Sequence, residues 1–352
     1  MRLLFLTKRH PQQRDLLERP YGRFYHLPAG LAARGHEVTV ALLSHRRLPG
    51  ERRERGGVTW YNDDLLPDPR AYLRRTEALV REMQPDWIVG TSDTYYGILA
   101  ARLAARFGTR CAIDAYDNFE SYMPWAWPLH AAWRRALGRA RLLTAAGPQL
   151  LERLRAHGPA AAGAIVPMAA DPAFRPADRH ESRRRFGLPI GAPLVGYCGS
   201  LFRSRGVATL LEAFALLRQQ RPDAVLVASG RVSISLPAHV RHLGYLPDDA
   251  VPAFLASLDV ACVTTLPGAF GSFAYPAKLY EALACGVPVV ATDVPPIRWI
   301  LGGDERLLAP PDNVEALAAR LEKQLVAPDV PPAPAGWAEA AGALEAALTS
   351  TA

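Results

Sequence analysis

The chain is poor in cysteine and in long apolar runs, and each shortage excludes a class of protein. Its 352 residues include four widely scattered cysteines, Cys111, Cys198, Cys262 and Cys285, which excludes a disulfide scaffold and predicts free thiols in a reducing compartment. No apolar run approaches the roughly 20 residues of a membrane-spanning helix. The apolar start ends at Lys8, too short for a secretory signal. We therefore expect a cytoplasmic protein.

Signs of metal chemistry are also absent from the sequence. No Asp-x-Asp occurs, so the metal–diphosphate clamp of one large transferase fold is missing, and the nine histidines lack metal-ligand spacing. We expect no metal and no cofactor.

Lysine is scarce as well, and the basic charge is unevenly placed. Three of the 41 basic residues are lysines, and the net charge of +7 lies in residues 1–60, which hold 12 Lys and Arg against 5 Asp and Glu. This asymmetry suggests an anionic partner, such as a membrane surface or a lipid phosphate, and we expect no nucleic acid. The alternative is an arginine-rich, solvated face. A peripheral site at the inner face of the plasma membrane is one location that fits.

The chain is long enough for two domains, and strand-like runs alternate with helical patterns throughout it. This alternation favours the α/β class with two doubly wound, Rossmann-like parallel sheets. The proline-rich segment 164–176 reads as the connection. We expect a first domain over 1–165, a second over 166–335 and a final helical segment over 336–352, with docking on the first domain as one option.

The most informative stretch is 272–292, which reads as a loop, a short helix, a turn and a buried strand. Pro276 suits the first turn of a helix, and Gly286 suits its left-handed C-terminal cap. A helix N-terminus offers free N–H groups and partial positive charge, to which Lys278 adds a full charge. Glu281 lies three residues on, on the same face. The segment therefore offers groups to a phosphate and to a sugar hydroxyl.

A second motif, 199–206, follows a strand and precedes an amphipathic helix, where a phosphate-binding turn lies in a doubly wound domain. It matches neither the Walker nor the dinucleotide glycine pattern. Arg203 and Arg205 can direct guanidinium groups at a diphosphate, although solvated loop arginines are the commoner case.

Taken together, these segments resemble glycosyltransferase family 4, a family of retaining enzymes with the GT-B fold. The resemblance spans most of the chain and is carried by segments 31–38, 114–120, 167–172, 195–214, 242–247 and 276–291. It implies that the two domains face a cleft, that the first binds an acceptor and that the second binds a nucleotide diphosphate sugar.

The resemblance also assigns residues to the donor site. It implies binding of the nucleotide sugar by Gly199, Ser200, Arg203, Arg205, Tyr245, Leu246, Ser272, Phe273, Lys278 and Glu281. Glu281 matches a glutamate that bonds the ribose in relatives, Lys278 would reach the diphosphate in a Pro-x-Lys-x-Tyr-Glu variant, and the backbone at Tyr245 and Leu246 would hold the base.

The sequence departs from the family pattern at two positions of this site. The first of the family's two paired glutamates falls on Phe273, which puts the identity of the donor sugar in doubt, and the Gly-Arg-Leu turn has Ser200 in place of its arginine. Arg205 falls where relatives carry a lysine, and Arg203 is the candidate to replace the lost cation. We expect a UDP-sugar ahead of a GDP-sugar.

Candidates for the acceptor side lie in the first half of the chain. Asp117 follows a strand and could take the acceptor proton or stabilise an oxocarbenium-like centre, or Asp114 or Asp117 merely caps the next helix. Further acceptor-site candidates are Asp93, Tyr116, Asn118, Trp125 and Trp127. The tryptophans beside arginines suit a lipid boundary or a sugar platform, and core packing is the alternative.

These expectations point to transfer of a sugar from a nucleotide diphosphate sugar to a saccharide or lipid-linked acceptor, with retention of configuration. The catalytic candidates are Asp117, Arg205 and Lys278. Two alternatives are a nucleotide-sugar epimerase of similar fold and a non-catalytic, degenerate member of the family that acts as a binding or scaffold protein.

Overall fold

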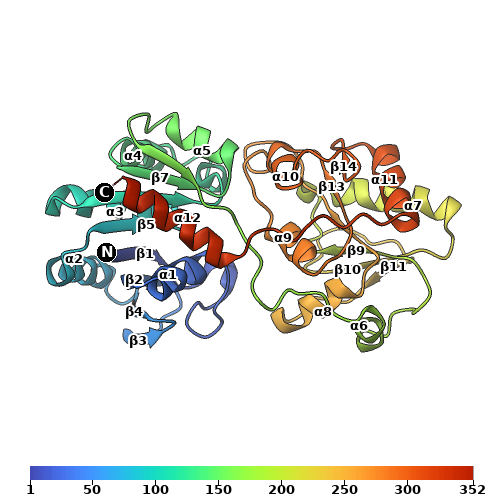
Figure 1. The fold of residues 1–352 in the computed structure, drawn as a ribbon, viewed down its shortest axis with the longest axis horizontal. Helices are drawn as coiled ribbons and strands as arrows, with labels where there is room; N and C mark the ends of the chain where they lie inside the picture. Colours follow the sequence, from blue (N-terminus) through green and yellow to red (C-terminus); the bar gives the residue numbers. More distant parts are fainter. Residues whose placement is uncertain (352) are drawn as a thin grey trace. The chain divides into compact units, whose positions relative to one another are not determined.

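The computed structural model describes residues 1–351, which form two α/β units. The first unit comprises Met1–Met168 and the C-terminal segment from Ala335, and the second comprises Ala169–Pro334. Each unit is a central sheet with helices on both faces (Figure 1). Strand–helix alternation in the sequence thus produces two doubly wound sheets, and the predicted fold class is confirmed.

The sheet of the first unit has eight strands in the order β3-β4-β2-β1-β5-β6-β7-β8. They are β1 (Arg2–Lys8), β2 (Glu37–Ser44), β3 (Glu51–Arg55), β4 (Val58–Asp64), β5 (Trp87–Gly90), β6 (Arg110–Ala115), β7 (Leu142–Ala145) and β8 (Ala162–Ile165). β3 pairs antiparallel with β4 at one edge, and the other pairs are parallel. The central strands are continuous apolar runs because helices cover both faces of the sheet.

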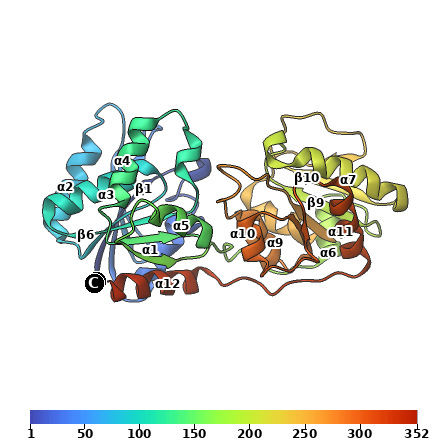
Figure 2. The ribbon, with the colours of Figure 1, turned by 90° about the horizontal axis from the view of Figure 1, so that it is seen from above.

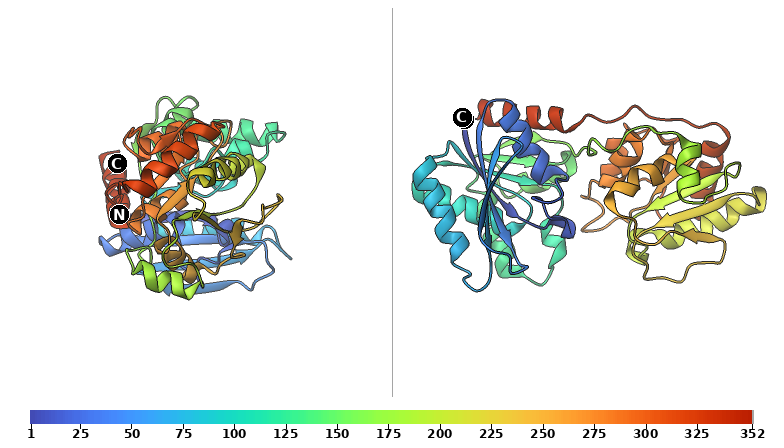
Figure 3. Two further views of the ribbon diagram at one scale, coloured as in Figure 1. Left: turned by 90° about the vertical axis from the view of Figure 1, so that its right-hand side faces the viewer. Right: turned by 90° about the horizontal axis from the view of Figure 1, so that it is seen from below.

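The first unit carries the helices α1 (Arg23–Ala33), α2 (Ala71–Met83), α3 (Thr94–Phe107), α4 (Trp127–Leu137), α5 (Pro148–Arg155) and α12 (Trp337–Ser350). The C-terminal α12 lies beside α1 (Figure 3, right). The two helices approach so closely that a Cβ atom at Gly30 would lie 2.6 Å from the Cβ atom of Ala341. The Glu345 carboxylate accepts a hydrogen bond from Arg34 Nε and is hydrogen-bonded to His36 Nε2. These two contacts hold α12 on this unit.

The sheet of the second unit has six parallel strands in the order β11-β10-β9-β12-β13-β14. They are β9 (Leu194–Cys198), β10 (Val225–Ser229), β11 (Val240–His242), β12 (Val260–Val263), β13 (Val289–Thr292) and β14 (Leu308–Ala309). The helices are α6 (Arg179–Arg185), α7 (Val207–Gln220), α8 (Val251–Ala256), α9 (Ala277–Ala284), α10 (Pro295–Ile300) and α11 (Val314–Val326). α7 and α11 pack side by side on one face of this sheet (Figure 2).

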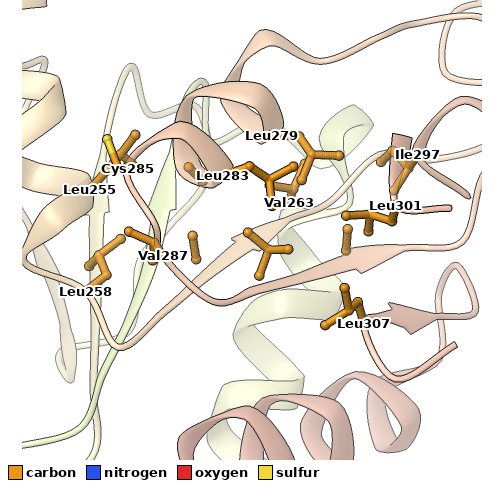
Figure 4. Close-up of a cluster of buried hydrophobic side chains, with 14 of the residues drawn as sticks. Leu255, Leu258, Val263, Leu279, Leu283, Cys285, Val287, Ile297, Leu301 and Leu307 are labelled. Atoms are coloured by element: carbon orange, nitrogen blue, oxygen red, sulfur yellow. The ribbon is translucent and has the colours of Figure 1, made fainter. Parts of the chain in front are cut away.

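The apolar side of α9 anchors this helix on the other face of the sheet. Leu279, Ala282 and Leu283 are spaced as one face of a helix and are almost completely buried. Leu279 and Leu283 point toward Val263 of β12 (Figure 4). Since α9 begins directly after Pro276, its first turn, which carries Lys278, is held at the carboxyl edge of the sheet. The sequence predicts Pro276 within the first turn of the helix, whereas in the structure Pro276 is the N-cap residue directly before that turn.

Candidate functional site

The carboxyl ends of the parallel strands of the second unit meet at one edge, where two glycine loops touch. Gly199 follows β9 with φ of +135° and donates its N–H to the Ser229 carbonyl oxygen at 2.9 Å. A Cβ atom on Gly230, which follows β10, would lie 1.9 Å from the Gly199 carbonyl oxygen. Both residues have backbone angles that favour glycine, and at Gly230 a side chain would also collide with the Gly199 carbonyl oxygen. The backbone at this edge therefore carries no side chain at these two positions.

The turn 199–206 packs against the loop that follows β12. The Thr264 hydroxyl donates to the Arg205 carbonyl oxygen at 2.6 Å, and the Arg205 guanidinium carbon lies 4.5 Å from the centroid of the Phe270 ring. Gly206, with φ of +72°, then opens α7. Arg203 is exposed and Arg205 is half-buried, so both side chains are accessible at this edge.

Lys278 reaches the same edge from α9. Its Nζ atom lies 3.2 Å from the Tyr197 hydroxyl oxygen and 4.2 Å from the centroid of the Tyr197 ring. A Cβ atom at Gly199 would lie 3.8 Å from this Nζ atom. The structure therefore brings the glycine turn and Lys278 together, although they are about 80 residues apart in the chain.

The remaining donor-site candidates lie on α9 and in the loops that follow β11 and β12. Glu281, one turn after Lys278, is 8% exposed. The Ser272 hydroxyl oxygen accepts the Gly268 N–H at 3.0 Å, and Phe273 donates its N–H to the Phe270 carbonyl oxygen, so the loop before α9 is folded on itself. Tyr245 is exposed, with the Arg231 guanidinium 5.8 Å from its ring centroid, and Leu246 packs against the core.

In the described part of the chain, the three cations at this edge are held without carboxylate partners. Within residues 1–351, none of Arg203, Arg205 and Lys278 forms an ion pair with an aspartate or glutamate. Two of the three rest on aromatic rings instead. Their positive charge is therefore not cancelled by a carboxylate, which favours binding of an anion.

In the first unit, the acceptor-site candidates follow β5 and β6, which are neighbouring strands. Asp93 is the N-cap of α3 and accepts the Thr94 N–H at 2.8 Å, and its carboxylate lies 3.7 Å from the Lys8 Nζ atom. The Asp117 carboxylate accepts the Tyr122 hydroxyl at 2.5 Å. Asn118 is buried, and its carbonyl oxygen accepts the Ser121 hydroxyl at 2.6 Å.

Two phenols surround Asp117. Burial raises the pKa of Tyr116 well above its ordinary value, and the Asp117 charge adds to this rise. Burial also raises the pKa of Tyr122, and the Asp117 charge again adds to the rise. Both phenols therefore stay protonated near neutral pH, and Tyr122 remains a donor to the carboxylate.

Sequence reasoning missed the main polar contact of this edge, which involves Asp114. This buried carboxylate accepts hydrogen bonds from Arg23 Nε at 2.7 Å and from the hydroxyls of Thr91 and Thr144. Arg23 also donates to the Val166 carbonyl oxygen at 2.7 Å. Asp114 is thus a buried ion-pair partner and not the helix cap that the sequence left open. An aspartate inside a buried strand signals that a partner exists, but not which one.

The tryptophans of 125–133 divide between surface and core. Trp133 packs in the core, whereas Trp125 and Trp127 are 74% and 75% exposed. The core-packing alternative therefore holds for Trp133 alone. Trp127 opens α4, and the backbone N–H of Trp127 bonds the Trp125 carbonyl oxygen.

Ion pairs with carboxylates outside residues 1–60 offset part of the basic excess of that segment. Lys8, Arg9, Arg23, Arg34, Arg52 and Arg53 each pair with a carboxylate. Three of these carboxylates, Asp93, Asp114 and Glu345, come from later parts of the chain. The local charge count therefore overstates the positive charge left at the surface.

Two kinds of feature are absent from residues 1–351. No helix there is both long and apolar enough to cross a bilayer, and no group of three or more His, Cys, Asp or Glu side chains is arranged to hold a metal ion. None of the four cysteines forms a disulfide bond; three are buried and Cys198 is half-buried.

Two family models match the chain, one on each unit. Residues 23–170 match the family described as "Glycosyl transferase 4-like domain", and residues 178–341 match "Glycosyl transferases group 1".

Curated relatives agree with these matches. The chain is 28% identical over 320 residues to 2-deoxystreptamine glucosyltransferase from Streptomyces kanamyceticus, covering 83% of this chain and 81% of that protein. It is 32% identical over 147 residues to the putative teichuronic acid biosynthesis glycosyltransferase TuaC of Bacillus subtilis. That match covers 41% of this chain and 36% of TuaC, so it spans about a third of the relative.

Solved structures match the fold over nearly the whole chain. The sucrose-phosphate synthase from Thermosynechococcus elongatus superimposes with a TM-score of 0.74 at 19% identity, covering 99% of this chain and 97% of that one. Anabaena HepE in complex with UDP-glucose gives a TM-score of 0.69 at 16% identity, covering 100% and 95%.

Proposed function

Because this chain belongs to the glycosyltransferases, with group 1 and 4-like domains in a GT-B fold, we propose that its second unit binds a nucleotide diphosphate sugar. The sugar then passes, with retention of configuration, to a saccharide or lipid-linked acceptor that is bound by the first unit. The observation that carries this proposal is the meeting of the Gly199 turn with the Lys278 ammonium group at the carboxyl edge of the second sheet. Ligands of open α/β sheets bind at this edge.

The donor site would work by electrostatics. Departure of the nucleoside diphosphate places negative charge on the β-phosphate, and Lys278, Arg205 and Arg203 supply positive charge without a carboxylate that would compete for it. The free N–H groups at the start of α9 and the uncovered backbone of Gly199 add donors to the same place. No divalent cation is needed for this stabilisation.

The other donor residues would orient the nucleotide and the sugar. Glu281 is the candidate for the ribose hydroxyls, and the backbone at Tyr245 and Leu246 is the candidate for the base. Phe273 and Ser272 would lie near the sugar, where an apolar ring in place of a carboxylate changes which hydroxyl is bound. We favour a UDP-sugar, in keeping with HepE, which was solved with UDP-glucose.

The acceptor would be bound beside Asp93, Tyr116, Asp117 and Asn118. Asp117 is held by the Tyr122 hydroxyl and is the candidate to take the acceptor proton or to stabilise a positive sugar centre. The names of the relatives support a polyhydroxylated acceptor, since one is named for 2-deoxystreptamine, an aminocyclitol, and another for teichuronic acid biosynthesis.

We further propose that the first unit associates with an anionic membrane surface from the cytoplasmic side. Trp125 and Trp127 are the most exposed of its large hydrophobic side chains, and Arg135 and Arg139, in and after the last turn of α4, are exposed cations. Tryptophan burial at a lipid interface combined with arginine attraction gives reversible, salt-sensitive binding.

The donor proposal is tested by a thermal-shift screen of the full chain against UDP, GDP, ADP and TDP, followed by turnover with the matching nucleotide sugars and saccharide acceptors. We expect stabilisation by UDP and release of UDP only when an acceptor is present. An isomerised nucleotide sugar formed without an acceptor would indicate the epimerase, and nucleotide binding without turnover of any donor would indicate a scaffold protein.

A further inference from the structure

We propose that Tyr197 is the positioning residue for Lys278. The hydroxyl and the ring of Tyr197 hold the Lys278 ammonium group in place for the donor diphosphate and leave the lysine charge uncancelled. This inference rests on the proposed donor site. Tyr197 lies in β9, two residues before Gly199, and is 1% exposed. It therefore belongs to the buried sheet and not to a surface loop.

The hydrogen bonds around the Tyr197 hydroxyl have one consistent direction. The Ser200 carbonyl oxygen, 3.2 Å away, can only accept, so the phenol proton points at it. The phenol oxygen then has its lone pairs for the Lys278 ammonium group, which can only donate and lies 3.2 Å away. The chain Lys278–Tyr197–Ser200 thus links the ammonium group to the turn 199–206.

The ring supplies the second half of the support. The Lys278 Nζ atom lies 4.2 Å from the ring centroid, within the range of a cation–π interaction. A lysine has a flexible four-carbon stem and loses considerable rotamer freedom when one position is required. Because Tyr197 already restricts that stem, less of this loss falls on the binding step.

A neutral support has an advantage over a carboxylate at this place. An aspartate or glutamate beside Lys278 would also fix it, but its charge would oppose the approach of a diphosphate. An aromatic ring fixes the cation and leaves its full charge for the ligand. Arg205 shows the same arrangement independently, since its guanidinium group lies on the Phe270 ring.

The proposal is tested with Tyr197→Phe, Lys278→Ala and the double variant, by calorimetric titration with UDP and with uridine. Tyr197→Phe keeps the ring and the fold but removes the hydroxyl. We expect its UDP affinity to fall about threefold to tenfold, the range for one lost hydrogen bond. Uridine affinity should stay unchanged, because uridine has no phosphate for Lys278 to meet. In the Lys278→Ala background the Tyr197→Phe substitution should have no further effect on UDP.

The matched control is Tyr72→Phe, which removes another buried hydroxyl that donates to a backbone carbonyl, that of Ala41 at 3.0 Å, in the first unit. It should leave UDP affinity unchanged. If Lys278→Ala weakens UDP binding and Tyr197→Phe does not, the positioning role is wrong and the donor site stands. An equal effect of Tyr197→Phe with and without Lys278 would also overturn it. If Lys278→Ala leaves UDP binding intact, the donor site itself is misplaced.

Discussion

The guanidinium group of Arg23 and the carboxylate of Asp114 form a two-pronged ion pair inside the first unit, with Nε–Oδ2 and Nη2–Oδ1 distances of 2.7 and 2.5 Å. Both side chains are almost fully buried. Arg23 opens α1, Asp114 lies in β6, and Arg23 also bonds the Val166 carbonyl oxygen after β8. The pair thereby joins three segments that are distant in the sequence.

Replacing Arg23 with Met should destabilise the first unit by about 3–5 kcal/mol, because the Asp114 charge would stay buried without its cation. The control is Arg34→Met, whose pair with Glu345 is largely exposed and should contribute about 1 kcal/mol or less. Urea unfolding followed by circular dichroism measures both. Equal losses in the two variants would show that burial of the Arg23 pair does not matter.

Lys278→Ala and Glu281→Ala should each weaken UDP binding by about 1.5–3 kcal/mol, which is the value of a hydrogen bond to a charged group. Lys323→Ala is the matched control, because it removes an exposed lysine from α11 of the same unit. Isothermal titration of the folded variants checks the prediction. Retention of full affinity in both site variants would contradict the donor-site assignment.

Turnover should not depend on a divalent cation. The three cations Arg203, Arg205 and Lys278 lie on the 199–206 turn and on α9 and are available for the leaving diphosphate. Initial rates with and without excess EDTA should agree within error. Loss of activity in EDTA with recovery on adding Mg²⁺ or Mn²⁺ would refute the prediction.

Asp117→Asn should lower kcat by about 100-fold or more while leaving UDP affinity unchanged, because the proposed role concerns proton transfer in the first unit. Asp68→Asn is the control, because Asp68 lies in the first unit outside the acceptor-site candidates and pairs with Arg74 at the surface. Asparagine keeps the side-chain oxygen that accepts the Arg70 N–H, so this variant should keep its fold and its activity. A comparable loss in the two variants would indicate a general disturbance of the first unit.

The first unit should co-sediment with anionic vesicles at low salt and be released as salt rises, since each arginine near such a surface contributes about 1 kcal/mol. Replacing Trp125 and Trp127 with Ala should reduce the bound fraction further. Trp299→Ala, a partly exposed tryptophan of the second unit, should not. Equal recovery with anionic and neutral vesicles would exclude the membrane surface.

The sequence predicts the fold well where apolar runs and glycines carry the information. The buried strands β1, β5, β9 and β13 are continuous apolar runs, and Gly286 has the expected left-handed angle, with φ of +69°. The edge strand β3 carries no such signal, because its residues, Glu51–Arg55, are charged and lack apolar alternation.

Side-chain partners are harder to predict than elements. The order of parallel strands explains why the Gly199 turn and Lys278 meet, because both follow from strand and helix positions. The Tyr197 support for Lys278 depends instead on two side-chain conformations, and the Arg23–Asp114 pair depends on a contact across 91 residues. Neither leaves a local pattern in the sequence.

The docking of α12 beside α1 makes the second unit an uninterrupted insertion within the first. Residues Ala169–Pro334 form one continuous stretch, whereas the first unit is assembled from two separate stretches. Shortening the chain from its C-terminus would therefore uncover the α1 surface around Gly30 before it reached any part of the second unit. For protein engineering, the second unit can be exchanged as a single cassette between two junctions, while the first unit requires both of its stretches.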